Sequence, residues 1–173
     1  MNTRKSMKLP IFITIFIICV IVYLFTNIKQ TTVVCHKTKT YESNIQLSES
    51  ITASIENKRI ENMDIVKTIT VLDKNKKEQK LNKIKDALDN SLEYLGKSYS
   101  IKITENSVVA RIQVNEKELV LLDNIDFSDT NGDLNIKIDV NTKSSDVISL
   151  TVGDNYTDGE LMKRLKSNGF TCK

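Results

Sequence analysis

The chain has 173 residues, with 25 Lys and Arg against 22 Asp and Glu, and 40% of its residues are hydrophobic. The basic excess comes from Arg4, Lys5 and Lys8, so the rest of the chain is electrically balanced. This balance, with few aromatic residues and no basic stripe, argues against a nucleic acid as partner, because phosphate neutralisation supplies most of that affinity. A single proline and five glycines also exclude proline-rich stalks and Gly/Ser linkers.

Residues 9–28 form an uncharged apolar stretch, and we expect a transmembrane helix there. The stretch has 20 residues, which at about 1.5 Å per residue span a hydrocarbon core of about 30 Å. A cleaved signal peptide is the alternative, but its apolar region is usually shorter and ends in small residues that this stretch lacks. The positive-inside rule then predicts a cytoplasmic tip over 1–8 and an extracellular domain over 29–173 of a single-pass membrane protein.

The three cysteines support a location outside the cytoplasm. Cys19 lies within the apolar stretch, whereas Cys35 and Cys172 lie near the two ends of the domain. In an oxidising compartment Cys35 and Cys172 are natural disulfide partners, with two unpaired thiols as the alternative. A zinc site is not expected, because His36 is the only histidine and no CxxC pair occurs.

Strands open the domain. Apolar and polar residues alternate over 45–55 and again over 63–71, which is typical of strands with one solvated face. Val33 and Cys35 indicate a further strand over 31–37. These three runs predict an antiparallel meander.

A helical period follows, and then strands return. One apolar stripe at spacings of three and four comprises Leu81, Ile84, Leu88, Leu92 and Leu95, and Gly96 ends it. The lysine-rich face of this helix predicts either a solvated surface or a membrane- or partner-binding face. Alternating residues predict strands over 99–103, 108–114 and 134–140, with a weaker one over 147–152.

A second helix closes the chain. Thr157 and Glu160 form a capping-box pattern at its start, and Gly169 followed by Phe170 is typical of a Schellman ending. The order of strands, helix, strands and helix predicts an α+β fold. We expect an antiparallel sheet with two helices packed on one face, preceded by one transmembrane helix.

One loop resembles the start of a calcium site. Asp129, Asn131 and Asp133 supply oxygen atoms at positions 1, 3 and 5 of such a loop. Leu134 stands where glycine makes the sharp turn, however, and Val140 stands where an acid closes the shell. We therefore expect a polar loop before a strand, with cation binding left open.

No other residues assemble into a catalytic or cofactor site. His36 has no placed nucleophile or acid beside it, and on a strand it points to the face opposite Cys35, so a surface histidine is expected. The pairs Asp123/Asp126 and Asp154/Asp158 match glycosidase carboxylates only as chance pairs among 22 acids. No catalytic, cofactor-binding or metal-ligating residue is assigned.

The two ends of the domain carry a resemblance. The run 156–161, the ending 169–173 and the early segment 32–35 after the apolar stretch resemble small membrane-anchored extracytoplasmic proteins of low-GC Gram-positive bacteria, the YehR-like (DUF1307) lipoproteins. The chain departs from them in lacking a cysteine placed for lipidation. The resemblance implies a bacterial α+β domain outside the cytoplasm and supplies no catalytic residues, because the activity of that family is not established.

Three hypotheses of function follow. The first is a module that binds an envelope protein, a peptide or a small ligand. The second is an extracytoplasmic hydrolase with acidic catalytic residues. The third is a structural or inhibitory module that acts through a sheet face or an edge strand.

Overall fold

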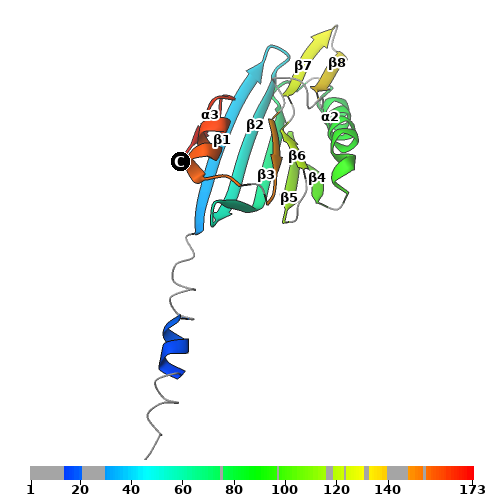
Figure 1. Cartoon of the computed structure of the whole chain (residues 1–173). Helices are drawn as coiled ribbons and strands as arrows, with labels where there is room; N and C mark the ends of the chain where they lie inside the picture. The colour runs from blue at the N-terminus through cyan, green and yellow to red at the C-terminus, as the bar shows by residue number, and fades with distance from the viewer. Residues whose placement is uncertain are drawn as a thin grey trace, which may run out of the picture. The chain divides into compact units, whose positions relative to one another are not determined.

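The computed structural model describes residues 14–20, 30–74, 76–96, 98–115, 119–122, 124–130, 133–139, 148–153 and 155–173 (Figure 1). The chain divides into two units, Met1–Gln30 and Thr31–Lys173. The second unit holds the sheets and the two longer helices of the described chain, and the functional argument concerns this unit.

The predicted transmembrane helix over 9–28 is wrong for the described part of the chain. The described helix in this region covers residues 14–20. Among the described residues, no helix is both long and apolar enough to cross a membrane.

The second unit is built on a six-stranded sheet with the order β10-β1-β2-β3-β5-β4 (Figure 1). The first three strands follow one another as expected, and each is longer than its predicted run. Their bounds, and those of the other members of the sheet, are β1 (Gln30–Tyr41), β2 (Ile45–Glu56), β3 (Arg59–Val71), β4 (Tyr99–Ile103), β5 (Ser107–Val114) and β10 (Thr171–Cys172). The pairs β2–β3, β3–β5, β4–β5 and β1–β10 are antiparallel.

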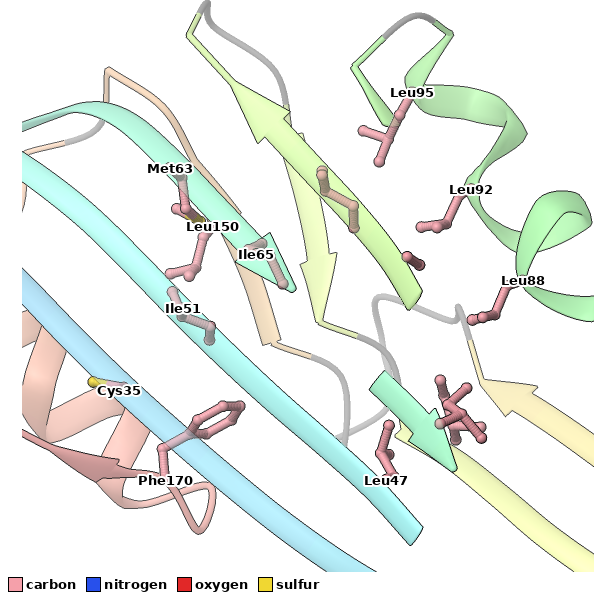
Figure 2. Packing of buried hydrophobic residues seen from close by; sticks show 14 of the residues in the cluster. Cys35, Leu47, Ile51, Met63, Ile65, Leu88, Leu92, Leu95, Leu150 and Phe170 are labelled. Carbon is pink, nitrogen blue, oxygen red and sulfur yellow. The ribbon is translucent and has the colours of Figure 1, made fainter. Parts of the chain in front are cut away.

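A second layer covers one face of this sheet, which we call the inner face. Its elements are α2 (Lys77–Leu92), the 3₁₀ turn η1 (Glu93–Leu95), α3 (Asp158–Lys166), β6 (Leu119–Leu122) paired with β9 (Ile148–Thr151), and the hairpin β7 (Asn124–Thr130) with β8 (Asp133–Asp139). Buried residues of the sheet, both helices and the hairpin form one core cluster. Figure 2 shows Leu88 and Leu92 of α2 on one side of this core and Phe170 beside Cys35 on the other. The fold of this unit is thus α+β.

The covering strands β6 and β7 were not expected from the sequence. The residues of β6 are Leu-Val-Leu-Leu, an apolar run without alternation, so its period does not distinguish a strand from other buried structure. Among the side chains of β7 that the structure describes, Ile125 and Phe127 are buried, and two apolar positions are too few to show a period of two. Pairing with β8 and burial against the sheet form this strand.

Helix α3 begins and ends as its sequence predicts. The Thr157 hydroxyl accepts a hydrogen bond from the Glu160 N–H, and a Glu160 carboxylate oxygen accepts one from the Thr157 N–H. At the other end the Phe170 N–H donates to the Leu165 carbonyl at 3.2 Å, and Gly169 has a φ of 85°. These bonds satisfy backbone groups that a helix terminus leaves open.

Candidate functional site

The predicted disulfide between Cys35 and Cys172 is confirmed. The two residues are register partners on β1 and β10, and their sulfur atoms are bonded. Beside them the Lys173 N–H donates to the Val34 carbonyl at 2.9 Å. The bond therefore attaches the end of the domain to the edge of its sheet and holds α3, which directly precedes β10, over the inner face.

An ion pair lies buried within the inner face. Lys67 on β3 and Glu49 on β2 are register partners, and Lys67 Nζ lies 3.4 Å from Glu49 Oε1. The Lys67 side chain is 0% exposed and that of Glu49 8%. Across β3, Lys67 pairs with Ala110 of β5, whose small side chain leaves room for the lysine stem. Burial of two opposite charges costs desolvation energy, which their pairing offsets.

Tyr41 links this region to the hairpin β7–β8. Its hydroxyl donates a hydrogen bond to the Ile125 carbonyl, and its ring meets the Phe127 ring edge-on at 5.0 Å between centroids. Burial raises the pKa of Tyr41 to about 12, and the negative charges of Asp126 and Glu49 act in the same direction. Tyr41 is therefore a neutral donor at physiological pH, and the hairpin is fixed to the end of β1.

Two lysines of α2 hold the hairpin from the other side. Lys80 Nζ lies 3.0 Å from Asp129 Oδ2 and 3.4 Å from Asp73 Oδ2, and Lys83 Nζ lies 2.9 Å from Asp133 Oδ1. The hydrogen bond with Asp129 raises the pKa of the Lys80 ammonium, although its burial acts the other way. The hydrogen bond with Lys83 lowers the pKa of Asp133. We call these two lysines and three acids the hairpin clamp.

The hairpin clamp accounts for two residues of the calcium-like loop. Asp129 and Asp133 each contact a lysine of α2, and Asn131 lies outside the described residues. Within the described chain, no group of three His, Cys, Asp or Glu side chains is placed to hold a metal ion. What the geometry shows for Asp129 and Asp133 is a structural role, attaching the hairpin to α2.

The remaining described candidates from the sequence lie on three different elements, His36 on β1, Asp126 on β7 and Asp158 on α3. His36 is exposed on β1 while Cys35 beside it is buried, as expected for opposite faces of a strand. Asp126 is paired with Lys39 at 3.9 Å. The Asp158 carboxylate accepts a hydrogen bond from the N–H of the next residue. Asp123 and Asp154, the other members of the two acid pairs, lie outside the described residues.

The face of the sheet opposite the core, which we call the outer face, is rich in hydroxyl groups. Its described side chains are half-buried or exposed, apart from Ser107 of β5, which is buried. The half-buried and exposed ones include Val34, His36 and Thr38 of β1; Gln46, Ser48, Ser50, Thr52 and Ser54 of β2; Asp64, Val66, Thr68 and Thr70 of β3; Ser100 and Lys102 of β4; and Val109, Arg111 and Gln113 of β5. Most are short, and many are β-branched, so they lose little rotamer entropy when a partner orders them.

Register places these side chains in rows across the strands. Ser48 pairs with Thr68, Thr68 with Val109, and Val109 with Lys102, while Thr38 lies 3.4 Å from Ser48 between hydroxyl oxygens. Neighbouring strands are about 4.8 Å apart and successive rows about 7 Å apart. Each hydroxyl both donates and accepts. The outer face therefore presents a regular array of small polar groups with valines between them.

Charge on the outer face is nearly balanced. Arg111 donates two hydrogen bonds of 2.9 Å to the two carboxylate oxygens of Asp64 on the adjacent strand. These bonds raise the pKa of the guanidinium, which stays charged. Because Arg111 is paired with Asp64, the described part of this face lacks the run of free cations that binding of a nucleic-acid backbone requires.

Comparison of the chain with protein-family models, with curated proteins and with solved structures gives no match. The resemblance to YehR-like lipoproteins thus stays a prediction.

Proposed function

We propose that residues 31–173 form an extracytoplasmic interaction domain that binds a protein partner through its outer face. The single observation that carries this proposal is the asymmetry of the six-stranded sheet. The buried core lies on the inner face, under two helices and four further strands, whereas the outer face keeps half-exposed side chains across five strands.

The chemistry of the outer face favours a protein over other partners. Short hydroxylated side chains with valines among them give a surface of mixed polarity, as non-obligate protein interfaces have. Small-molecule sites are instead concave and mostly apolar. Val34 is 41% exposed and adds to the apolar share of the face. The alternative of a hydrolase with acidic catalytic residues stays a prediction, because none of the described contacts favours it.

A photo-crosslinking residue tests the interaction. Replacement of Thr68, at the centre of the outer face, should give a crosslinked product of one defined mass in cells that make the protein. The matched control is replacement of Lys163, which is exposed on α3. Equal crosslinking at both positions, or none at Thr68, would contradict the proposed surface. A second variant, Thr68→Arg, should lose the purified partner while its unfolding midpoint stays unchanged.

The disulfide supports a location outside the cytoplasm, because structural disulfides persist in oxidising compartments. A thiol-reactive mass tag applied to intact protein from cells provides the test. The chain has three cysteines, and Cys19 is the free one in the described chain. We expect one tag per chain before reduction and three after it. Three tags before reduction would place the domain in a reducing compartment.

A further inference from the structure

Strand β4 forms one end of the six-stranded sheet, and within the described chain only β5 pairs with it (Figure 1). The other end of the sheet is different. There the two-residue strand β10 and the disulfide occupy the edge of β1 at Cys35 and His36. An open edge is a template for pairing with another strand. The β4 edge is thus one on which an extended segment can add along the whole strand, whereas β1 is partly covered.

The hydrogen bonds around β4 show which backbone groups face this edge. The Gln113 N–H donates to the Ser98 carbonyl, and the Thr104 N–H donates to the Ser107 carbonyl, both at 2.8 Å. In an antiparallel pair, alternate residues bond to the same neighbour. Ser100 and Lys102 therefore bond to β5. The N–H and C=O groups of the three residues between and beside them, Tyr99, Ile101 and Ile103, point away from the sheet.

We propose that β4 pairs antiparallel with β4 of a second copy of this chain, with Ile101 opposite Ile101 of the partner subunit. In this register Tyr99 lies opposite the partner subunit's Ile103, and Ile103 lies opposite the partner subunit's Tyr99. All three outward-facing residues then exchange both backbone hydrogen bonds with the partner. The two neighbouring registers would place Ile101 opposite Tyr99 or opposite Ile103 of the partner subunit. In either of them, only two of these residues per chain would exchange both hydrogen bonds.

Side chains favour the same register. On the inner face it pairs an aromatic with a β-branched residue twice, Tyr99 with Ile103 of the partner subunit, a combination that stabilises antiparallel pairs. Ile103 is 37% exposed in the single chain and gains cover. On the outer face Ser100 lies opposite the partner subunit's Lys102. One of the shifted registers would instead place the two copies of Lys102 directly opposite each other, which is unfavourable.

The assembly closes at two copies. Both copies use the same strand, so the contact is isologous and leaves no second β4 edge free for a third copy. Pairing would join two six-stranded sheets into one and place the two outer faces side by side. Self-association through β4 does not depend on the outer face having a partner, so the two proposals can fail separately.

Sedimentation of the full chain, kept in a mild detergent because of the apolar residues 9–28, gives the first test. Ile101→Pro removes the central outward N–H, and proline is tolerated on an edge strand where the N–H faces outward. Loss of two backbone hydrogen bonds per dimer should raise the dissociation constant at least about tenfold. Ile101→Ala is the matched control, since it loses the same apolar contact and keeps the N–H. A wild-type chain that stays monomeric at high concentration overturns the proposal.

Cysteine crosslinking gives a second readout that does not depend on stability. In a hydrogen-bonded antiparallel pair, opposite Cα atoms lie about 5.5 Å apart, within reach of a disulfide. In a Cys19→Ser background, Ile101→Cys should therefore form a dimer under mild oxidation. Glu105→Cys, in the turn after β4, should not, because the register separates its two copies by several residues. Equal dimer yields for both variants, or dimers insensitive to Ile101→Pro, contradict this register.

Discussion

Lys67 and Glu49 are the residues whose chemistry fits their surroundings least well. The inner face around them is apolar, with Ile51 and Ile65 one row away in the same strand pair. A buried ion pair is weak evidence for stability, because desolvation offsets much of the attraction. Its best-attested use is to fix register. Here a slip of β2 against β3 would separate Lys67 from Glu49 and break the buried pair.

We expect Lys67→Met to destabilise the domain by about 3–5 kcal/mol, because it leaves the Glu49 carboxylate buried without this partner. The double variant Glu49→Leu/Lys67→Met should unfold at a higher urea concentration than the single one, since both charges are then gone. Urea unfolding of the full chain and the variants measures both effects. Additive losses from the two positions would show that the pair has no mutual dependence.

Asp133 gives a pH-dependent prediction. Its hydrogen bond with Lys83 lowers the carboxyl pKa in the folded chain. The contribution of Asp133 to stability is therefore present above the ordinary pKa of about 3.9 and is lost as the pH falls through the lower folded value. Carboxyl titration by NMR should show a midpoint that rises in Lys83→Gln. Lys85→Gln, two residues further along α2, should leave the midpoint unchanged.

At the residue scale, the sequence shows the buried pair as two charged residues at positions where the alternation of apolar and polar residues would place an apolar one. The alternation over 45–55 places Glu49 at an inward position, and that over 63–71 does the same for Lys67. Either charged residue alone is compatible with an irregular strand. Only the register, with Glu49 opposite Lys67, shows that the two charged residues are partners. Register depends on pairing between strands, which a single strand's period does not encode.

Among the elements, α3 was predicted best because its signals are local. Caps and the apolar face lie within a few residues of one another, so sequence spacing fixes their geometry. Within the covering layer, β8 and β9 were predicted, but their partners β7 and β6 were not. β6 forms by pairing with β9, and β7 by pairing with β8 and by burial of Ile125 and Phe127.

Removal of the cap of α3 should have a defined effect. Thr157→Ala loses the oxygen that accepts from the Glu160 N–H at 3.2 Å, and loss of an N-cap costs about 1 kcal/mol. Thr157→Ser keeps the oxygen and should stay close to the wild type. Thermal unfolding followed by circular dichroism distinguishes the two variants. Equal midpoints for Ala and Ser would show that the cap does not limit stability.

For the whole molecule, the disulfide is the largest single constraint that we can test. The bonded cysteines are 137 residues apart in sequence, and closure of a loop of that size is worth about 5 kcal/mol in the chain-entropy description. We expect Cys35→Ser/Cys172→Ser to lose about 2–5 kcal/mol of unfolding free energy in urea. Cys19→Ser, which removes the free thiol, should lose none. An unchanged midpoint after reduction of the wild type would contradict this expectation.

The sequence predicts the polarity of the outer face but not which strands contribute to it. Serines and threonines between the apolar residues of 45–55 predict a solvated strand face, and the structure places them on the outer face. The rows that they form with β3, β5 and β1 need the strand order, which crosses from β3 to β5. Local pattern thus predicted the polarity of the surface, and tertiary pairing determined its extent.

The bond between Cys35 and Cys172 also sets how the domain responds to mechanical tension. A pull applied between the segment before residue 35 and the segment after residue 172 passes from one sulfur to the other. The load bypasses every strand and helix between the two cysteines. A covalent bond resists forces that separate hydrogen-bonded strands. The domain therefore keeps its shape under tension as long as the disulfide is intact. Reduction would transfer the same load to the hydrogen bonds of β1.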